Sequence, residues 1–390
     1  MENVLAKRMG QLKPSGTMAM AEMARRLAKK GWKVLHLEVG DPDFDTPNHI
    51  KEAALKALKE GFTHYTSSRG IPELREAIAE DLKKRHKIEI DPENEVIVTP
   101  GSKHAIYSAC MAILNPRDEV IVLSPTWPTH FTCIEAVEAI PVEVPCGETY
   151  RLDEEKLKEK ITQKTKMILI SSPNNPTGGV LSREDVKAVT DIAEDYNLLV
   201  LSDEIYDCIT YDGVNAESAA SVADSHERVI LVNGFSKRYA MTGWRLGYAV
   251  ADKVIIEALS RIQQTTTTCP ASFIQKAGVA ALTGSQECVE KMIKEYDRRR
   301  IFLIKELNSI PGLKCPTPKG AFYVFLKYSD KNPSMEICKK LLEEKGVCTT
   351  PGGVFGQYGE GQIRISYATS LETLKEAVER IMEFFSETSN

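Results

Sequence analysis

The chain has 390 residues, of which 42% are hydrophobic and 27% charged, and its formal net charge is -5. This composition is typical of a globular protein with room for two domains, and it excludes disordered, collagenous and coiled-coil chains. The acidic balance offers no basic field to a polyanion, so we expect no nucleic-acid partner. The basic run at 298–300 lies in a helical pattern and predicts a solvated charged face.

Cysteine usage and hydropathy indicate the compartment. Nine cysteines are scattered without a CxxC pair or a Cys/His cluster. We therefore expect a reducing compartment, the cytoplasm, with no disulfide framework and no metal site. The N-terminal stretch 1–16 lacks the apolar core of a signal sequence, and no stretch approaches the ~18 uninterrupted apolar residues of a membrane helix. We expect neither export nor a membrane partner.

Short runs rich in Val, Ile and Leu alternate with longer amphipathic stretches. The runs lie at 95–100, 119–125, 140–145, 166–173, 198–204, 228–234 and 245–250. They are typical of buried parallel strands, with one antiparallel strand near the end of the series. Helices are predicted between them at 103–114, 126–138 and 182–196, the last with a capping box at Ser182 and Asp185. The pattern predicts an α/β fold, with a three-layer, mostly parallel large domain over 48–285.

After Pro270 the pattern changes to long helical stretches around a few strands, at 321–326 and 362–368, followed by a C-terminal helix. This change predicts a second, smaller α+β domain. The first 45 residues are too few for a domain of their own, so we expect them to pack with the C-terminal part. The small domain would then comprise 1–47 and 286–390.

Unusual polar residues follow the predicted strands. Ligands bind beyond the carboxyl ends of the strands in open α/β sheets, which makes these positions candidates for a site. They are Gly101, Ser102, Lys103, Trp127, Asn174, Asn175, Asp203, Tyr206, Ser236 and Lys237. Each alone has an ordinary explanation, such as a helix cap or a surface lysine, but together they predict one site.

The turn at Gly101 and Ser102 leads from a strand into a helix. Backbone N–H groups at such a positive helix end suit a phosphate ester. No GxGxxG follows a strand and no GxxxxGK[ST] occurs, so the two commonest nucleotide-binding interpretations lose their main support. A phosphate is therefore favoured over a dinucleotide.

The other side chains fit one flat, charged ring. Trp127 suits stacking on the ring, and Asp203 suits a ring nitrogen that is kept protonated. Asn175 and Tyr206 suit a ring oxygen, and Lys237 suits an electrophilic carbonyl. Pyridoxal phosphate has all of these groups.

Several long motifs carry a family resemblance. They are SSPNNPTGG at 171–179, SDEIYD at 202–207, NGFSKRYAMTGWRLGY at 233–248 and RISYA at 364–368. These motifs closely resemble those of the class I aminotransferases, which are fold-type-I pyridoxal-phosphate enzymes, and the pattern is aspartate aminotransferase-like. Further motifs at 37–47 and 64–78 extend the resemblance over nearly the whole chain. The resemblance implies transfer of an amino group between an amino acid and a 2-oxo acid.

Catalytic and ring-binding roles follow from the matched motifs. The resemblance implies that Lys237 forms the covalent imine with the cofactor and moves the substrate proton. It implies that Asp203 pairs with the pyridinium nitrogen, which makes the ring an electron sink. Tyr206 and Asn175 correspond to residues that hydrogen-bond the phenolic oxygen. Ser236, just before the lysine, is also counted among the cofactor-binding residues.

The resemblance also implies contacts to the cofactor phosphate. Arg245 matches the phosphate-binding arginine, with backbone support from Ser102 and Lys103. Many family members carry a serine three residues before the lysine, and Gly234 stands there in this chain. The resemblance therefore implies one phosphate contact fewer in this chain. Tyr65 resembles the tyrosine that reaches the partner subunit's phosphate, which implies a homodimer with shared active sites.

Other matched residues concern the substrate. Arg364 resembles the arginine that binds the substrate α-carboxylate, supported by Asn175 and the backbone at Gly40. In one branch of the family a lysine in the phosphate turn and an N-terminal serine bind the distal carboxylate. Lys103 and Ser15 match them. Trp127 lines the same pocket in this interpretation, and one of the prolines near Asn175 is a candidate for a cis peptide bond.

The substrate pair expected from this match is aspartate with 2-oxoglutarate. Alanine or aromatic amino acids remain alternative donors, and a pyridoxal-phosphate β-lyase remains an alternative activity. A pyridoxal-phosphate-sensing transcription factor is a third alternative, but it would need a DNA-binding module of ~70 residues ahead of the fold. Only about 45 residues precede it here, without a helix-turn-helix pattern. A doubly wound nucleotide-binding protein is the plainest alternative.

Overall fold

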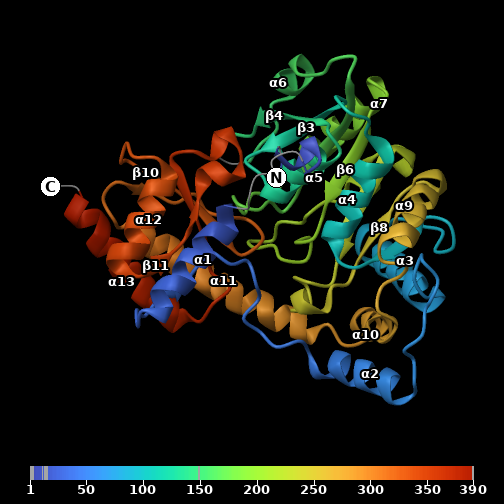
Figure 1. Ribbon diagram of the computed structural model, residues 1–390, viewed down its shortest axis with the longest axis horizontal. Helices are drawn as coiled ribbons and strands as arrows, with labels where there is room; N and C mark the ends of the chain where they lie inside the picture. The colour runs from blue at the N-terminus through green and yellow to red at the C-terminus, as the bar shows by residue number, and fades with distance from the viewer. Residues whose placement is uncertain (1–3, 11, 13–15, 148–149, 389–390) are drawn as a thin grey trace.

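A seven-stranded sheet with the order β2-β8-β7-β6-β5-β3-β4 forms the centre of the molecule (Figure 1). The structure is a computed structural model that describes residues 4–10, 12, 16–147 and 150–388. The strands are β2 (Val96–Thr99), β3 (Glu119–Ser124), β4 (Ile140–Pro145), β5 (Thr165–Ser171), β6 (Leu199–Asp203), β7 (Val229–Gly234) and β8 (Gly247–Val250). Only β8 runs against its neighbours, β2 and β7, so the expected late antiparallel strand is confirmed.

Successive strand residues point to opposite faces of this sheet, and each face is buried under helices. On β3, Ile121 and Leu123 join one apolar cluster, while Val120 and Val122 join the other. The cluster around Val120 lies under α4 (Ser102–Ile113), α5 (Pro128–Ala136) and α9 (Lys253–Thr266). The opposite face is covered by α2 (Asn48–Lys59), α3 (Pro72–His86), α6 (Glu154–Glu159), α7 (Arg183–Asp195), α8 (Ala219–Val222) and α10 (Ser272–Thr283). The predicted three-layer α/β arrangement is confirmed, as is the capping box that opens α7.

A third apolar cluster holds the smaller α+β part together. Its strands form an antiparallel sheet with the order β12-β13-β10-β9 and a parallel pair of β1 with β11. The elements are α1 (Gly16–Lys29), β1 (Leu35–His36), α11 (Glu287–Asn308), β9 (Leu313–Lys314), β10 (Tyr323–Tyr328), α12 (Ser334–Lys345), β11 (Val347–Cys348), β12 (Thr350–Pro351), β13 (Gln362–Ser366) and α13 (Leu371–Thr388). Tyr206 and Tyr211, which follow β6 of the large sheet, also join this cluster. The segment after β6 therefore connects the two parts.

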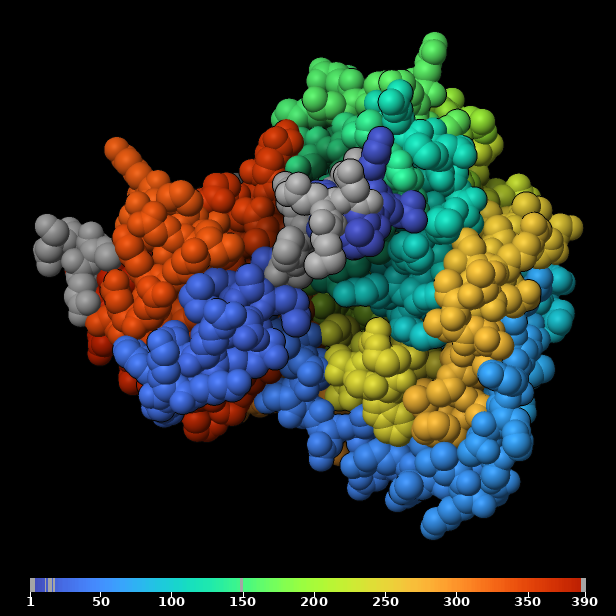
Figure 2. All heavy atoms as spheres, in the orientation of Figure 1, coloured from blue at the N-terminus to red at the C-terminus, as the bar shows by residue number. Residues whose placement is uncertain are grey.

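The N-terminal segment lies over both parts of the molecule (Figure 2). α1 packs against β12 and α12, and β1 pairs with β11, so packing of the N-terminal residues with the C-terminal part is confirmed for these elements. The short 3-10 helix η1 (Lys7–Gly10) instead contacts α5 of the large part, and Arg8 lies 3.7 Å from the carboxylate of Glu138. The expectation is wrong for this first segment, because its contacts are with the large part. The exact domain boundaries remain a prediction.

Further 3-10 turns lie between the regular elements. They are η2 (His226–Arg228), η3 (Thr242–Trp244), η4 (Gly352–Phe355) and η5 (Gln357–Gly359). No helix of the described residues is long and apolar enough to cross a membrane. All nine cysteines lie within the described residues and are free.

The basic run on α11 is not fully exposed to solvent, contrary to the prediction from the sequence. Arg298 is exposed, but Arg299 and Arg300 are only 5% and 2% exposed. Arg299 pairs with Asp43 at 2.8 Å, and Arg300 pairs with Asp212 at 2.7 Å. The prediction is wrong because consecutive helix residues are rotated by about 100° and cannot share one face. The acidic partners come from distant loops, which a local charge pattern does not reveal.

Candidate active site

The carboxyl end of β6 places Asp203 in a buried polar pair. Asp203 is the last residue of β6 and is 3% exposed. Its Oδ2 lies 2.9 Å from Nε2 of His130, and Nδ1 of His130 lies 2.9 Å from Oγ1 of Thr126. A carboxylate can only accept, so Nε2 donates to Asp203. The two contacts fix the orientation of the imidazole ring and the direction in which the carboxylate points.

His130 and Thr126 were not predicted from the sequence. They flank Trp127, which was predicted, in the TWPTH stretch where β3 leads into α5. A polar side chain three residues after Trp127 lies close to it at the start of the helix, and the two rings meet edge to face at 5.5 Å. That spacing was the available signal.

Lys237 lies after the carboxyl end of β7, where it meets a backbone carbonyl. Its Nζ donates to the carbonyl oxygen of Gly40 at 2.5 Å. A side chain at Gly40 would collide with the hydroxyl of Tyr323, so the close approach requires glycine. Burial lowers the pKa of Lys237 to about 8; Asp41 opposes this shift, and Arg364 adds to it. Half of this amine would therefore be unprotonated near pH 8, far below the ordinary lysine range.

Two tyrosines meet beside the lysine. The hydroxyl groups of Tyr206 and Tyr323 lie 2.7 Å apart, and both residues are buried. Burial raises the pKa of Tyr206 well above its ordinary value, and the neighbouring Tyr323 raises it further. The phenol of Tyr206 therefore stays protonated, and one of the two hydroxyls donates to the other, which leaves one O–H free to donate to a further acceptor. Tyr323 was missed, because nothing in the strand pattern at 321–326 distinguishes a tyrosine that faces the site from one in the core.

Arg364 on β13 is brought to the predicted asparagine loop. Its Nη1 donates to Oδ1 of Asn175 at 2.9 Å, and its Nη2 donates to the carbonyl of Glu38 and to Oγ1 of Thr350. The loop peptide before Pro173 is cis. The structure thus joins two predicted residues that lie far apart in the sequence.

The charge of Arg364 is not neutralised. The residue is 3% exposed, and its Nε is buried without a hydrogen-bond partner. Among the described residues no carboxylate forms an ion pair with it, and its guanidinium lies 4.5 Å from the ring centre of Tyr323. Burial lowers its pKa. A buried cation with an unused donor is costly unless an anion completes it, so the arrangement suits a bound carboxylate.

The predicted phosphate turn is a cradle of backbone and guanidinium groups. Gly101 has a φ of +87° at the N-cap of α4, and a Cβ there would lie 2.5 Å from Nη2 of Arg245. A Cβ at Gly247 would collide with the backbone N of Ser102. Arg245 also donates to the carbonyl of Thr242 at 2.8 Å. Two glycines therefore let the arginine and the helix N-terminus converge on one point, which fits a phosphate group.

Lys103 and Trp127 meet at the edge of this cradle. Lys103 is exposed on the first turn of α4, and its Nζ lies 4.9 Å from the ring centre of Trp127. Such a cation over an indole face is attracted by the ring quadrupole. The side chain therefore points across the cradle toward the residue that was expected to stack on a ring.

The remaining predicted residues have separate places. Ser236 is buried next to Lys237, and Tyr65 is 86% exposed. Ser15 lies outside the described residues. Gly234 packs against β8, where a Cβ would lie 3.0 Å from Cα of Gly247. This close approach accounts for glycine at the place where many family members have serine.

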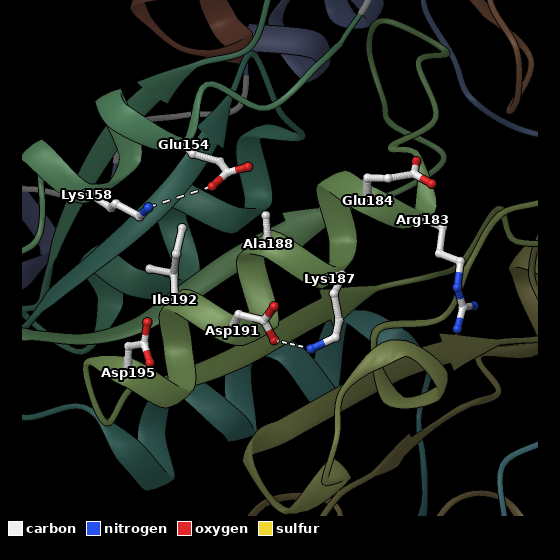
Figure 3. Close-up of a pocket in the computed structure, with 9 residues that line it drawn as sticks. All are labelled: Glu154, Lys158, Arg183, Glu184, Lys187, Ala188, Asp191, Ile192 and Asp195. Atoms are coloured by element: carbon white, nitrogen blue, oxygen red, sulfur yellow. Dashed lines mark hydrogen bonds and ion pairs between the residues drawn. The ribbon is translucent and has the colours of Figure 1, made fainter.

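The described residues contain no group of three or more His, Cys, Asp or Glu that could hold a metal ion. A hollow of about 430 Å³ lies between α6 and α7, away from all of the predicted site residues (Figure 3). Its lining is Glu154, Lys158, Arg183, Glu184, Lys187, Ala188, Asp191, Ile192 and Asp195. Its two lysines pair with acidic residues of the lining, Lys158 with Glu154 and Lys187 with Asp191, and Arg183 pairs with Glu217. It offers no unused donor like that of Arg364.

Comparison with known proteins identifies the family. The family model described as aminotransferase class I and II matches residues 33–381. The chain belongs to this family. The class I aminotransferases are pyridoxal-phosphate-dependent enzymes that exchange amino groups between amino acids and 2-oxo acids, so the cofactor predicted from the sequence and the enzyme class are both confirmed.

Individual relatives cover nearly the whole chain. An aspartate aminotransferase from Pyrococcus abyssi is 46% identical over 89% of this chain and 90% of its own. An aromatic-amino-acid aminotransferase from Thermococcus litoralis is 41% identical, with 98% of both chains covered. The solved structure of an alanine aminotransferase from Pyrococcus furiosus superposes with a TM-score of 0.94 at 36% identity and covers 98% of this chain and 100% of that chain.

Proposed function

We propose that this aminotransferase moves the amino group of aspartate to 2-oxoglutarate, as a cytoplasmic homodimer with shared active sites. The observation that carries the proposal is that two of the predicted site residues are cations with no carboxylate partner among the described residues. Arg364 is a buried cation with an unused donor, and Lys103 is an exposed cation beside Trp127. A dicarboxylate has one anionic group for each of them.

The described residues fit pyridoxal phosphate. The cofactor supplies an aldehyde that condenses with amines and a ring that accepts electrons when its nitrogen is protonated. Arg245 and the backbone at Ser102 and Lys103 would hold the phosphate, and Asp203 would hold the ring nitrogen. Support for this placement comes from the glycine-lined cradle and from the buried carboxylate oriented by His130.

Other residues would bind the rest of the ring and move the proton. Tyr206 and Asn175 would bond the ring oxygen, and Trp127 would cover the ring face, with Ser236 buried beside the lysine. Lys237 would attach the cofactor and then carry a proton to and from the substrate Cα. Its lowered pKa supports this role, because an amine near pH 8 is a usable base at neutral pH.

The α-carboxylate of the substrate would bind Arg364. A bidentate carboxylate satisfies the buried guanidinium, whose Nε has no other partner. Asn175 already orients Nη1 at 2.9 Å, and the backbone at Gly40 lies beside Lys237. Ser15 belongs to the expected distal-carboxylate pair and stays a sequence-based proposal.

The first test concerns the proposed contact between Lys103 and the distal carboxylate of the substrate. Replacing Lys103 with methionine should lower kcat/KM for aspartate and glutamate by about 10- to 100-fold, or ~1.4–2.7 kcal/mol, because a charge-assisted contact is lost. Neutral donors such as alanine should change less than threefold. Steady-state rates with each donor at saturating cofactor measure both effects.

Lys187 provides a matched control, since Lys187→Met removes a surface lysine from α7 that pairs with Asp191. This variant should leave kcat/KM unchanged for every amino donor. Equal losses for aspartate and alanine in Lys103→Met would assign Lys103 to the cofactor and remove the main support for a dicarboxylate.

The exposed Tyr65 gives a second test, of the shared site. A tyrosine that is 86% exposed in one chain suits a contact made by a second copy. Tyr65→Phe should weaken cofactor retention by about tenfold, since one hydrogen bond to a charged group is lost. Dialysis followed by absorbance of the remaining cofactor measures this retention.

Hybrid dimers show whether Tyr65 contacts the cofactor of the partner subunit or acts within its own chain. Mixing inactive Lys237→Ala chains with Tyr65→Phe chains should yield one site that contains both intact residues, and activity should recover above that of either parent. A tyrosine that serves its own chain gives no recovery.

The relatives support more than one donor. The relatives named above include an aspartate, an aromatic and an alanine aminotransferase, so alanine and aromatic amino acids are the alternative donors. A β-lyase of the same fold would release pyruvate and ammonia from cystathionine. The cytoplasm is supported by the nine free cysteines, which suit a reducing compartment.

A further inference from the structure

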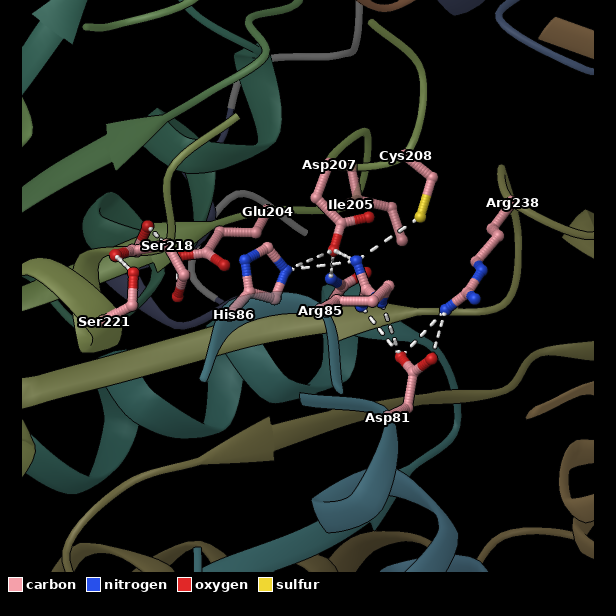
Figure 4. Close-up of polar contacts among 12 residues, drawn as sticks. Asp81, Arg85, His86, Glu204, Ile205, Asp207, Cys208, Ser218, Ser221 and Arg238 are labelled. Atoms are coloured by element: carbon pink, nitrogen blue, oxygen red, sulfur yellow. Dashed lines mark hydrogen bonds and ion pairs between the residues drawn. The ribbon is translucent and has the colours of Figure 1, made fainter. Parts of the chain in front are cut away.

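Behind the candidate site, four charged residues form a chain that links α3 to two site segments, and all of them are buried except the partly buried Arg85 (Figure 4). We call Asp81, Arg85, Asp207 and Arg238 the α3 ion-pair network. Asp207 directly follows Tyr206, and Arg238 directly follows Lys237. The network contacts neither reacting group, yet it holds the next residue of each.

The first link joins the lysine segment to α3. Nη1 of Arg238 donates to both carboxylate oxygens of Asp81, at 3.0 and 2.8 Å. Arg238 also donates through Nη2 to Gln286 at 2.9 Å. Arg238 is 9% exposed and Asp81 is 8% exposed, so solvent screens this pair little.

The second link joins α3 to the tyrosine segment. Arg85 donates through Nε to Asp81 at 2.9 Å and through Nη1 to Asp207 at 2.6 Å. Asp207 also accepts from Nδ2 of Asn233 at 2.8 Å. Asn233 lies near the end of β7, so Asp207 ties α3, the segment after β6 and the end of β7 together.

The charges of the network depend on one another. Burial opposes ionisation of Asp207, but Arg85 and His86 outweigh burial and lower the pKa of Asp207 below its ordinary value. Without Arg85, Asp207 would be a buried carboxylate that keeps His86, Asn233 and Cys208 as neighbours and Arg238 as a further cation. A buried charge that loses its partner is strongly destabilised, so its segment must move toward water or take up a proton.

The network lacks spare partners. Arg85 also lies 3.4 Å from Sγ of Cys208 and 3.1 Å from Nε2 of His86. Neither neighbour can replace the carboxylates. Glu204, drawn beside His86 in Figure 4, is buried with one oxygen unpartnered, and its other oxygen accepts from Ser218 at 3.0 Å. Among the described residues, Glu204 forms no hydrogen bond or ion pair with the four network residues, since its paired oxygen is held by Ser202, Ser218 and the backbone of Ala219.

We propose that Arg85 is a positioning residue for the transamination reaction. By holding Asp81 and Asp207 together, it fixes the two backbone segments that carry Lys237 and Tyr206, and so sets the position of the lysine amine relative to the ring oxygen contacts. Reaction rates respond steeply to such placement, because a shift of about 1 Å in a reacting group costs about 10²-fold. The inference rests on the proposed roles of Lys237 and Tyr206.

A matched pair of variants tests this role. Arg85→Met should lower kcat by about 10- to 100-fold and change KM for the amino donor less than threefold, because the donor binds Arg364, outside the network. Arg75→Met is the control: Arg75 is an arginine on the same helix that is more deeply buried than Arg85, with side chains 5% and 21% exposed, and it pairs with Glu93 at 2.8 Å. Its loss should lower stability in a similar way but leave kcat within threefold.

A second readout uses the enzyme freed of cofactor. Trinitrobenzenesulfonate labels unprotonated lysines, and peptide mapping reports the labelling of Lys237 at each pH. The wild-type midpoint should lie near 8, where burial has lowered the pKa of this amine. In Arg85→Met the loosened segment admits water, so the midpoint should rise by about one unit toward the ordinary lysine value. In Arg75→Met the midpoint of Lys237 labelling should remain near the wild-type value.

The conservative variant Arg85→Lys keeps the proposal testable if Arg85→Met does not fold. Arg85→Lys keeps the charge but cannot donate to both carboxylates from one planar fork, so we expect it to fold and to show an intermediate loss of kcat. An Arg85→Lys enzyme with wild-type kcat and midpoint would overturn the positioning role, as would equal kcat losses in Arg85→Met and Arg75→Met. If wild-type enzyme carried no cofactor on Lys237, the proposed function would fail instead.

Discussion

Replacing Lys237 with alanine should lower transamination by about 10²- to 10⁴-fold, since the reaction would lose the residue that we propose as the base for the substrate proton. The folded state should persist, because this side chain forms no ion pair with a carboxylate among the described residues and donates to one backbone carbonyl. Single-turnover rates with excess cofactor measure the loss, and circular dichroism checks the fold. Lys187→Ala, on the surface of α7, is the control and should keep the wild-type rate.

The same lysine predicts a pH dependence. Cofactor attaches only to an unprotonated amine, and burial places the pKa of Lys237 near 8. The rate at which cofactor-free enzyme captures pyridoxal phosphate should therefore rise with pH and reach half its maximum near 8, well below the ordinary lysine value. Borohydride should then fix the cofactor onto Lys237. A label on another lysine, or a midpoint above 10, would contradict the assignment.

Strand-end residues were the part of the site that the sequence predicted. Asp203 and Lys237 follow runs of buried β-branched residues, and the sheet brings the ends of β6 and β7 together. Because neighbouring parallel strands end at the same edge, this convergence follows from the fold class alone. The order of the strands did not follow from the fold class: β8 lies between β2 and β7, although it is the last of the seven strands of this sheet in sequence order.

Contacts between distant segments could not be read from local patterns. His130 meets Asp203 across 73 positions, and Tyr323 meets Tyr206 across 117. Both residues look ordinary in their own stretches, since one follows a helix start and the other lies in an apolar strand. Such pairs depend on tertiary packing. They could not be predicted from the sequence because the order of the strands in the sheet was not known.

The prediction of a solvated basic run on α11 was wrong for the same reason. Arg299 is neutralised by Asp43, 256 positions away, and Arg300 by Asp212, 88 positions away. A charge run on a helix is usually solvated, and the exception arises where loops from other elements bring carboxylates to it. These two pairs hold the loop that carries Gly40 and the segment after β6 against the small part. The wrong prediction therefore concerned residues that support the site.

Replacing Asp203 with alanine should lower kcat by about 10²- to 10³-fold even at saturating cofactor, because the ring nitrogen would lose the anion that keeps it protonated. Cofactor should still bind through the cradle at Gly101 and Arg245. Absorbance titration with pyridoxal phosphate measures binding, and the rate of substrate proton exchange measures the chemistry. Near wild-type turnover in Asp203→Ala would show that the ring needs no such partner.

The neighbouring Glu204 separates this role from general loss of a buried carboxylate. Glu204 is 1% exposed, and burial raises its pKa to about 7, so about half of it already carries a proton at neutral pH. Glu204→Gln imitates that protonated form and should keep kcat within threefold. Glutamine also cannot ionise, so above pH 7 this variant should be more stable to heat than wild type, whose buried Glu204 must then take a charge. The two adjacent carboxyls should thus respond oppositely: loss of Asp203 removes catalysis, whereas loss of the Glu204 charge spares it.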